Sequence, residues 1–564
     1  MNVLGICNTF DSGAALIIDG VVIAAANEER FLREKQTKEF PKNAIEYVLS
    51  EGGLTIDNID LVGCGAWAGI DMYHTLPSLV DDSVRLTSDA DEISMVKQRI
   101  QASLKSDKAG RSSLLKSIRQ IGIPEWKVIF CDHHLAHACA AFFPSPFENA
   151  IIMIADGRGD FRSASIWRAD RAEGISHINT VSELSSIGAM YGFITKLLGF
   201  RPHRHEGKIT GLAAYGKTSE VVAHLKEGIF FNPDSGRIES KFTDYYLPFV
   251  SAELPELQAL TKTVPREDFA FAAQQVIEDV LTQYLSFHIK SNYEVPVNLC
   301  LGGGCAANVK LNFELSKIPE VENVYVAPSM GDAGNALGGA IHVATSMDER
   351  SDIQMENVYL GSAFTSEEIA FVCSEEKLDY RVLEDSVKQN YLLQCLEEGK
   401  IIGWFRGRME FGPRALGNRS IIASPADPAI NEQLNQRLSR TEFMPFAPVT
   451  TEDLAPLCFI DWKKDQPTSY FMTMCYECTK FMIEECPATV HIDKTARPQI
   501  VRRSDNPEYH DLIKNYYELT GRPALINTSF NHHEEPIVRT PHDAIRSFLK
   551  GNVDVLAMEA VVVE

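Results

Sequence analysis

Residues 297–308, VNLCLGGGCAAN, lead an apolar strand directly into a turn of three glycines. The run Val297–Leu301 is short and apolar, as expected of a buried strand, and a long apolar helical pattern at Phe269–Ile289 precedes it. A second short strand is expected at Val324–Val326. Helix, strand, glycine turn and strand in succession are typical of an α/β fold, in which helices cover the faces of a sheet.

The glycine turn at 301–308 is one of four such turns. The others are Thr9–Ala15, Ala155–Phe161 (ADGRGDF) and Gly331–Gly339 (GDAGNALGG), the last of which precedes an apolar helix. Glycine lets backbone N–H groups approach phosphate oxygens, and a helix N-terminus adds partial positive charge. A single turn of this kind is usually only a turn. Four of them, two with Asp beside Gly after a strand, favour a two-lobed actin-like ATPase fold.

The rest of the chain extends this α/β pattern. An Asp19-Gly20 turn between apolar runs predicts a β-hairpin near the N-terminus. Polar and acidic sequence around 346–360 separates two α/β domains, which we expect at 1–350 and 351–564. The other expected elements are strands at Val3–Ile6, Ala14–Ile18, Val21–Ala26, Val128–Cys131, Ile151–Ala155 and Ala524–Ile526, and helices at Pro41–Ser50 and over much of 71–125.

Composition and charge narrow the class of protein. Of 564 residues, 45% are apolar and 23% charged, which is ordinary for a soluble globular protein without membrane helices. A net charge of −23 argues against a surface for nucleic acid. The first residues lack the basic segment of a signal peptide, and twelve scattered cysteines suit reduced thiols, so a cytoplasmic protein is expected. Cys475 and Cys478 form a lone CxxC in strand-like sequence, where metal binding is not expected.

One segment runs against the acidic average. Residues 401–440 hold three acids, no Lys and six arginines, namely Arg406, Arg408, Arg414, Arg419, Arg437 and Arg440. The planar guanidinium matches the oxygens of phosphate and carboxylate in a bidentate fashion. A solvated helix face is the alternative. Four of the six arginines, however, lie among Gly, Pro and aromatic residues (WFRGRMEFGPRALGNRS), which favours a site for a small anion.

His133 and His137 lie four residues apart in DHHLAHA (132–138). On a helix they share one face, which is a frequent spacing of two metal ligands. The protease signature HExxH is absent, and His134 would point elsewhere. Such a pair alone is more often not a metal site, but the phosphate-type turns favour one because a divalent cation normally accompanies a triphosphate. Two imidazoles with a carboxylate suit iron, zinc or manganese better than magnesium.

Two other segments carry polar side chains in patterns typical of sites. HRHEGKITGLAAYG (203–216) combines cationic residues with glycines, and a surface loop is the alternative. The expected strand Ala524–Ile526 delivers Asn527, Thr528 and Ser529 into a turn, where they are suited to orient a small polar ligand. A plain strand cap is the alternative there.

Taken together, these strings resemble the O-carbamoyltransferases of antibiotic and nodulation-factor biosynthesis, the family of tobramycin carbamoyltransferase. The resemblance spans nearly the whole chain in family order, which makes it far more specific than any single glycine turn. It rests on DHHLAHACAAF (132–142), HEGKITGLAAYGK (205–217), GGGCAANVKLN (302–312), GDAGNALGGA (331–340), GRMEFGPRALGNRSI (407–421), FMPFAPV (443–449), HIDKTARPQIV (491–501) and NTSFNHHEEPIV (527–538).

The resemblance implies an actin-like ATPase domain, similar to the tRNA threonylcarbamoyl-transfer protein, followed by a YrdC-like domain. A metal, Fe(II) first with Mg or Mn as alternatives, would be held beside the ATP phosphates by His133, His137 and Asp332. Asp156 would act on the same phosphate face. The residues that would bracket the nucleotide are Gly157, Gly303, Gly304 and Asn308. The residues that would line a carbamoyl phosphate pocket are Arg414, Arg419, Arg440, Arg497, Asn527, Thr528 and Ser529.

The implied chemistry has three steps. Carbamoyl phosphate yields carbamate in the Arg-rich pocket, carbamate passes through an enclosed path to ATP and forms carbamoyl adenylate with release of pyrophosphate, and a hydroxyl of a small-molecule acceptor then displaces AMP. Family members often carry a His immediately before the first-loop Asp, as a base for the acceptor. Here Phe10 stands there, so Asp11 and His205 are the candidate substitutes, with Lys208 as a further catalytic candidate.

Two other functions are open to this sequence. An actin-like ATPase or kinase would leave the Arg-rich C-terminal domain without a role. An ATP-switched scaffold would leave the HxxxH pair and the NTSFN string unexplained. Nothing in the sequence identifies the acceptor, whose specificity is expected in the divergent segments 71–125 and 228–265, and a homodimer is possible.

Overall fold

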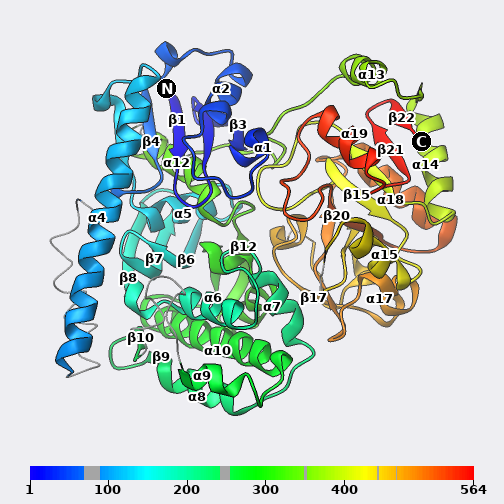
Figure 1. Cartoon of the computed structure of the whole chain (residues 1–564). Coiled ribbons are helices and arrows are strands. Elements are labelled where there is room, and N and C mark those ends of the chain that lie inside the picture. Colours follow the sequence, from blue (N-terminus) through cyan, green and yellow to red (C-terminus); the bar gives the residue numbers. More distant parts are fainter. Residues whose placement is uncertain (69–70, 72–88, 242–254, 348–351, 441–443, 465) are drawn as a thin grey trace. The chain divides into compact units, whose positions relative to one another are not determined.

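The computed structural model describes residues 1–68, 71, 89–241, 255–347, 352–440, 444–464 and 466–564 (Figure 1). Its contacts divide the chain into two units. Unit 1 comprises Met1–Ala24 and Lys38–Met355, and unit 2 comprises Ala25–Thr37 and Glu356–Glu564. The break at 355 lies within the acidic stretch expected to separate two domains. The segment Ala25–Thr37 is different, because it lies early in the sequence yet packs within unit 2.

Hydrogen bonds explain why this early segment belongs to unit 2. The guanidinium of Arg33 donates to the carbonyl oxygens of Pro536 and Ile537 at 2.6 and 2.7 Å, and Arg30 donates to that of Gly412 at 3.0 Å. Arginines that reach backbone carbonyls several hundred residues away have no local sequence signature. No pattern in the sequence predicts that residues 25–37 pack within unit 2 while the segments before and after them belong to unit 1.

The first sheet of unit 1 is built on β1. This strand pairs antiparallel with β2 and parallel with β4, and β4 pairs parallel with β5. The order is β3-β2-β1-β4-β5. The strands are β1 (Asn2–Cys7), β2 (Gly13–Ile18), β3 (Val21–Asn27), β4 (Leu61–Cys64) and β5 (Val128–Phe130).

The second sheet of unit 1 repeats this plan around β6. Strand β6 pairs antiparallel with β7 and parallel with β11, β11 pairs parallel with β12, and the order is β12-β11-β6-β7-β8. The repetition confirms the expected two-lobed α/β architecture. These strands are β6 (Asn149–Gly159), β7 (Arg162–Asp170), β8 (Gly174–Ser182), β11 (Val297–Gly302) and β12 (Val321–Val326).

Helices α5 (His133–Phe142) and α12 (Asn335–Met347) pack against each other at the centre of unit 1. Their closest approach needs a glycine, because a Cβ at Gly338 would lie 1.9 Å from the carbonyl oxygen of Ala136. Helix α12 also packs on β1, β2 and β4, so it joins the first sheet to α5. The expected helix over Phe269–Ile289 is present as α10 (Arg266–Asn292), whose buried face is rich in Ala, Val, Ile and Leu.

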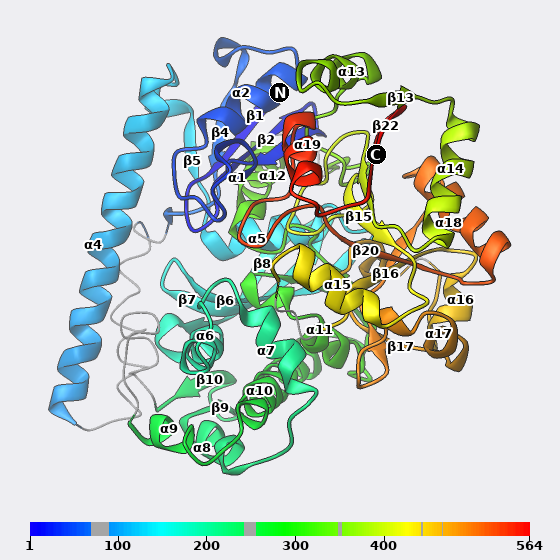
Figure 2. The same ribbon diagram turned by 45° about the vertical axis from the view of Figure 1, so that its right-hand side comes forward.

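The other elements of unit 1 surround these layers. Helix α4 is long and stands at the edge of the unit in both views (Figures 1 and 2). It accounts for part of the helical structure expected over 71–125, and the remainder of that expectation lies largely outside the described residues. The elements are α2 (Lys42–Glu51), α4 (Ala90–Gln120), α6 (Ile187–Leu197), α7 (Glu206–Ala213), α8 (Glu220–Gly228), β9 (Ile229–Asn232), β10 (Arg237–Ser240), α9 (Pro255–Leu260) and α11 (Val309–Ser316).

Unit 2 is organised around one mixed sheet of eight strands in the order β13-β22-β21-β14-β15-β20-β16-β19. Alternate residues of its strands enter two separate apolar cores: Phe405 and Ile421 belong to one, and Trp404 and Ile422 to the other. This period of two places helices on both faces. The strands are β13 (Tyr380–Val382), β14 (Ile402–Phe405), β15 (Arg419–Ala423), β16 (Ala447–Thr451), β19 (Gln499–Val501), β20 (Leu525–Ser529), β21 (Val555–Met558) and β22 (Val561–Val563).

The fold of the whole chain is therefore mixed α/β, as expected. The YrdC-like assignment of unit 2 stays a prediction. The remaining elements of unit 2 are α1 (Glu29–Leu32), α13 (Ser366–Glu375), α14 (Asp385–Glu397), α15 (Ala429–Arg437), α16 (Ala455–Cys458), β17 (Tyr476–Glu477), α17 (Lys480–Glu485), β18 (Thr495–Ala496), α18 (Pro507–Thr520) and α19 (Pro541–Leu549).

Two local expectations in unit 2 are wrong. The alternating sequence around the CxxC forms only the two-residue strand β17, because the helix α17 begins at Lys480, capped by the Thr479 side chain. Strand β20 does not end at Ile526. It continues to Ser529, because that residue still pairs with Ser420 of the neighbouring strand β15.

Two findings bear on the class of protein. Among the described residues, no helix combines the length and apolar character needed to cross a bilayer. All twelve cysteines lie in the described part of the chain, and each is a free thiol.

Candidate functional site

The pair His133 and His137 lies on α5, as the sequence predicts. Asp132 caps this helix by accepting the N–H of Leu135 at 3.0 Å, and its other carboxylate oxygen lies 2.9 Å from the Arg162 guanidinium. The N–H of His133 donates to Asp160 at 2.8 Å. These contacts fix the first turn of the helix and hence the direction of both imidazoles, which are 3% and 1% exposed.

Two carboxylates from other elements meet the imidazoles. Asp156 comes from β6, and Asp332 comes from the glycine turn before α12. The Nε2 atoms of His133 and His137 lie 3.2 Å apart, 3.4 and 3.3 Å from Asp156 Oδ2, and 3.5 and 3.7 Å from Asp332 Oδ1. We call these four residues the ligand cluster. One ligand atom from each lies within 4.8 Å of all the others.

The spacing of the ligand cluster suits a first-row divalent cation. Bonds of about 2.0–2.2 Å from a metal to nitrogen and oxygen ligands at right angles place neighbouring ligand atoms about 3 Å apart. The Nε2 atoms of His133 and His137 face each other at 3.2 Å, which neutral imidazoles satisfy only if one of them donates. A cation bound by both nitrogens removes this constraint. Two imidazoles and two carboxylates favour iron, zinc or manganese.

Electrostatics within the ligand cluster call for positive charge. Burial disfavours the charged forms, yet the imidazoles of His133 and His137 hold the pKa of Asp332 well below its usual range. Burial likewise opposes protonation of His133, but Asp332 and Asp156 hold the pKa of this imidazole well above its ordinary value. The carboxylates are therefore ionised, and either an imidazolium or a bound cation neutralises them.

Three glycine turns meet at the ligand cluster. Gly303 has φ +85°, and a Cβ there would lie 2.3 Å from the carbonyl oxygen of Ala155. A Cβ at Gly304 would lie 3.0 Å from Asp156 Oδ1. Asp156 therefore lies directly against the 301–308 turn. Gly157 follows Asp156, and its N–H donates to the Asp156 carboxylate at 2.7 Å.

The fourth turn, near the N-terminus, also reaches the ligand cluster. Thr9 Oγ1 donates to Asp332 Oδ2 at 2.7 Å, and the N–H of Phe10 donates to the same oxygen at 3.3 Å. These bonds orient Asp332 and lower the cost of keeping its charge buried. The four turns that the sequence singled out thus converge, by their contacts, on one place in unit 1.

Sequence reasoning missed several residues that support the ligand cluster. Gly159 is required because a Cβ there would lie 2.0 Å from the His133 ring. Asn335, the first residue of α12, places its amide nitrogen 3.4 Å from His133 Nδ1. Thr9 is the third. Only their place inside or beside a glycine turn marks them in the sequence, and that signal does not separate support from ligation.

The other site residues predicted in unit 1 lie on different elements, and some of them already have hydrogen-bond partners within the protein. Asn308 caps α11 and shares two hydrogen bonds with Gln274, so its side chain is already engaged. His205 precedes α7, and its Nδ1 accepts the N–H of Arg201 at 3.1 Å. Lys208 is buried on the same helix, and Asp11 lies in the N-terminal turn.

In unit 2 the arginines of 401–440 have mostly structural partners. Arg419 is fully buried, and it donates to the carbonyl oxygens of Arg406, Gly407, Asn418 and Ser362 at 2.5–3.2 Å. Its guanidinium therefore holds these loops together. In an anion site it would stabilise the loops and would not be the group that contacts the anion. Two others are similarly engaged, Arg408 with the carbonyls of Leu360 and Gly361 and Arg437 with Asp554.

Arg440 lies against the NTSFN string. Its guanidinium donates to the hydroxyl oxygen of Thr528 at 2.8 Å, to the Ser529 hydroxyl at 3.1 Å and to the side-chain oxygen of Asn531 at 2.7 Å. The fold thus brings the predicted site residues Arg440, Thr528 and Ser529 into one hydrogen-bonded group. Asn531 is an additional member that sequence reasoning did not include.

A second group gathers around Asn527. Its amide nitrogen donates to the carbonyl oxygen of Ala415 at 3.2 Å and to Gln499 Oε1 at 2.6 Å. Arg414 precedes Ala415 in one loop, Arg497 lies two residues before Gln499, and both arginines are half-buried. Asn527 is 1% exposed, and its Oδ1 accepts no hydrogen bond within the described part of the chain.

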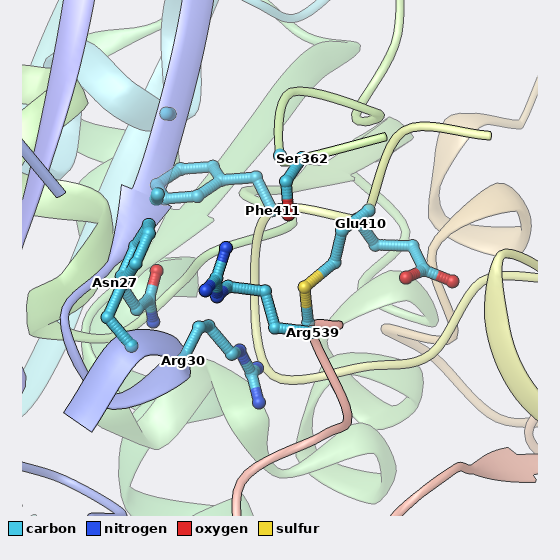
Figure 3. A pocket seen from close by; sticks show the side chains of 11 residues that line it. Asn27, Arg30, Ser362, Glu410, Phe411 and Arg539 are labelled. Atoms are coloured by element: carbon cyan, nitrogen blue, oxygen red, sulfur yellow. The ribbon is translucent and has the colours of Figure 1, made fainter. Parts of the chain in front are cut away.

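A pocket of about 270 Å³, which includes space open to solvent, lies elsewhere in unit 2 (Figure 3). The side chains of Asn27, Arg30, Ser362 and Arg539 surround it. The carboxylate of Glu410 points away from Asn27 and Arg30. That carboxylate instead accepts the N–H groups of the loop residues Leu416, Asn418 and Arg419 at 2.7–3.1 Å. None of the predicted anion-site residues lines this pocket.

Comparison with known proteins places the chain in a family. Two family models match: Carbamoyltransferase N-terminus over residues 2–341 and Carbamoyltransferase C-terminus over residues 393–564. An uncharacterised protein of Synechocystis sp., sll1178, is 31% identical over 99% of this chain and 96% of its own length. Nodulation protein NolNO of Sinorhizobium fredii is 30% identical over 100% of this chain and 80% of its own length.

An enzyme of named activity is also similar. The 3′-hydroxymethylcephem-O-carbamoyltransferase of Streptomyces clavuligerus is 28% identical over 72% of this chain and 77% of its own. Among solved structures, the activator of 2-hydroxyisocaproyl-CoA dehydratase from Clostridium difficile is 13% identical with a TM-score of 0.35, over 61% of this chain and 95% of its own, and this likeness carries no functional argument. The two family models together span most of the chain, which therefore belongs to the carbamoyltransferase family.

Proposed function

We propose that the protein is an ATP-dependent O-carbamoyltransferase, which uses carbamoyl phosphate to carbamoylate a hydroxyl group of a small molecule such as a natural product or a sugar. The observation that carries the proposal is the ligand cluster of unit 1, where two imidazoles and two carboxylates converge beside four glycine turns. A triphosphate needs that combination of cation ligands and backbone donors. Membership of the carbamoyltransferase family supplies the reaction class.

Carbamoyl phosphate is assigned to unit 2. Arg414 and Arg497 would bind its phosphate oxygens, and the free Oδ1 of Asn527 would accept an N–H of its carbamoyl group. Arg440 would hold Thr528 and Ser529 in place for the same ligand. Arg419 would act from behind, by fixing the loop that carries Arg414. Neutralising the phosphate would favour attack of water on its phosphorus atom. The P–O bond to the carbamoyl oxygen then breaks, which gives inorganic phosphate and carbamate.

Carbamate and ATP are assigned to unit 1. The N–H groups of the turns at 155–161 and 301–308 would bind phosphate oxygens, and enclosure would protect the carbamoyl adenylate from water. A divalent metal bound by His133, His137, Asp156 and Asp332 would supply Lewis acidity at the phosphates. Fe(II) suits these ligands best, with Mn or Mg as alternatives. Asp156 thus joins the three ligands implied by the resemblance. The acceptor hydroxyl then displaces AMP.

An actin-like ATPase or kinase with an anion-binding C-terminal domain is the second candidate, and a cytoplasmic location accompanies both. Product analysis separates them. The protein is incubated with ATP and carbamoyl phosphate, and the nucleotides and phosphates are resolved by ion-exchange chromatography. The proposal predicts pyrophosphate and inorganic phosphate that both depend on carbamoyl phosphate, and AMP from hydrolysis of the carbamoyl adenylate once the reaction is quenched. ADP with inorganic phosphate would instead establish the kinase or ATPase.

A further inference from the structure

The turn that carries the ligand Asp156 has a flexible backbone sequence. Gly157 and Gly159 flank Arg158 in it, and glycine loses more conformational freedom on folding than any other residue. Gly159 cannot be exchanged for a stiffer residue, because a Cβ there would lie 2.0 Å from the His133 ring. Arg158 therefore has the one side chain between the two glycines through which the rest of the protein can fix this turn.

Two buried carboxylates hold Arg158. Its Nη2 atom donates to both oxygens of Asp107 at 2.9 and 2.8 Å, and its Nε atom donates to Glu183 Oε2 at 2.5 Å. Asp107 lies on α4 and Glu183 follows β8, and each of them is 1% exposed. The hydroxyl of Ser103, also on α4, donates to the other oxygen of Glu183 at 2.9 Å. Helix α4 thus reaches the turn through a buried ion triad, Arg158, Asp107 and Glu183.

Apolar contacts join the same elements. Phe161, at the end of the turn, shares one apolar cluster with Val96 and Ile100 of α4 and with Leu184. The carbonyl oxygen of Phe161 also accepts the N–H of Glu183 at 3.0 Å. Helix α4 and the segment after β8 therefore fix both the middle and the end of the turn.

The turn meets the ligand cluster on both sides of Arg158. Before it, Asp156 supplies an oxygen that lies 3.3 and 3.4 Å from the two Nε2 atoms of the cluster. After it, Asp160 accepts the N–H of His133 at 2.8 Å. A displacement of Arg158 would accordingly move one ligand directly and disturb the first turn of α5, which carries two others.

Stability alone does not call for this triad. Burial raises the pKa of the Asp107 carboxyl group, although Arg158 opposes the change, so keeping the carboxylate charged in this place costs free energy. Apolar residues of similar volume often replace a buried ion triad with no loss of stability. An ion triad differs from an apolar cluster in that its hydrogen bonds are directional, so it fixes the position of the guanidinium and of the backbone that carries it.

We propose that Arg158 is a positioning residue of the metal site, and that it holds Asp156 at the distance from the two ligand imidazoles that a cation requires. Asp107 and Glu183 act through Arg158. None of the three contacts the metal or a substrate in this role. Helix α4 thereby takes part in the site without supplying a ligand. This inference rests on the proposed function, because it concerns the same divalent metal.

The test separates positioning from stability by two changes in the triad. Arg158→Lys keeps the charge but loses the planar fork that reaches both carboxylates. The triple variant Asp107→Leu/Arg158→Met/Glu183→Leu replaces the triad by apolar side chains and should keep the stability of wild type. Arg171→Lys is the matched control, because Arg171 is also half-buried and donates to three backbone carbonyl oxygens outside the glycine turns.

Full-length proteins are purified with their metal and mixed with excess EDTA, and the metal that stays bound is followed by elemental analysis. Urea denaturation gives the midpoint of unfolding. We expect Arg158→Lys and the triple variant to release metal about 10–100-fold faster than wild type, the usual effect of removing a group that orients a ligand. The triple variant should unfold at the urea concentration of wild type, and Arg171→Lys should release metal at the wild-type rate.

Metal release within about twofold of wild type in Arg158→Lys would overturn the inference, and this variant decides alone if the triple variant does not fold. The same acceleration in Arg171→Lys would also overturn it, because the effect would then follow from the loss of any buried guanidinium. Wild type that forms pyrophosphate without bound metal would overturn the inference as well. If wild type neither holds metal nor forms pyrophosphate, the proposed function itself is wrong.

Discussion

The two polar centres of this protein solve the same problem, buried charge, in different ways. In the ligand cluster of unit 1, the charged atoms of His133, His137, Asp156 and Asp332 point at one another. In unit 2, the buried charge of Arg419 points at backbone carbonyl oxygens. The first arrangement needs an imidazolium or a bound cation to neutralise its carboxylates, whereas the guanidinium of Arg419 already donates to four carbonyl oxygens.

The comparison shows that several residues of one type close together in a sequence do not by themselves identify a binding site. Six arginines within forty residues predict an anion site, yet several of them have partners within the protein. A buried arginine with well-placed acceptors is a structural element. Two histidines four residues apart are a weaker sequence signal, but they project from one face of a helix whatever the tertiary context.

The largest effect is expected where the ligand cluster is broken. His137→Ala removes one of four ligands and should lower AMP formation by at least about 1,000-fold, because metal charge would no longer offset the phosphates. Elemental analysis of the purified variant should show loss of the metal found in wild type. His224→Ala on α8 is the control and should retain it. Full metal content in His137→Ala would remove this histidine from the ligands.

Arg414, in a loop, and Arg419, at the start of β15, should separate an effect on binding from an effect on stability. Arg419→Ala leaves four carbonyl oxygens without their donor in a buried site and should lower the free energy of unfolding by about 3–5 kcal/mol. Arg414→Ala should change stability by less than about 1 kcal/mol and weaken carbamoyl phosphate binding by about 100-fold, with ATP binding intact. Urea denaturation and calorimetry measure both. Unchanged carbamoyl phosphate affinity in Arg414→Ala would refute its assignment.

A smaller effect is expected at the glycine turn of unit 1. Gly303→Ala places a Cβ against the Ala155 carbonyl and strains a residue with φ +85°, so it should cost about 2–3 kcal/mol of stability. Nucleotide affinity should fall with it, because the turn must shift away from Asp156. Gly399→Ala is a matched control, because φ is +78° there and nothing lies within 4 Å of the added Cβ. This substitution strains the backbone without creating a steric contact. Equal losses in both would show that close packing at Gly303 is unimportant.

The smallest effect is expected at the carboxyl group of Glu278, which forms none of the ion pairs in the described part of the chain. Burial raises the pKa of Glu278 on α10 to about 7. The folded state then holds a proton that the unfolded state releases between about pH 4.5 and 7, so stability falls as pH rises through this window. Glu278→Gln should be more stable than wild type by about 1–3 kcal/mol at pH 8 and equal to it near pH 4.5.

Denaturation midpoints at the two pH values test this prediction. Asp279→Asn, which removes an exposed ion pair with Lys226, serves as the control and should show no comparable pH dependence. A difference between Glu278→Gln and wild type that does not change with pH would contradict the assigned pKa.

Much of unit 1 is predictable from its sequence because the determining signals are local. Strands β1, β2, β3 and β11 and helix α2 begin and end within a few residues of their expected positions, since apolar runs and turn residues set them. The role of Asp156 as a fourth member of the ligand cluster is not predictable from spacing. It depends on how β6 approaches α5, which is a tertiary contact.

Unit 2 is less predictable for the same physical reason. The partners of Arg408 lie at Leu360 and Gly361, far away in the chain, and the strand β20 extends past Ile526 because β15 is there to pair with it. The segment Ala25–Thr37 joins unit 2 through carbonyl contacts that any sequence offers. Composition and periodicity carry no record of such distant partners.

The central claim is that carbamate, formed from carbamoyl phosphate, attacks ATP at the ligand cluster. Exchange of labelled pyrophosphate into ATP measures this step directly, because only a reversible adenylation returns the label to the nucleotide. The account predicts exchange that requires carbamoyl phosphate and is abolished in His137→Ala. Exchange without carbamoyl phosphate, or ADP formation with no exchange at all, would contradict it.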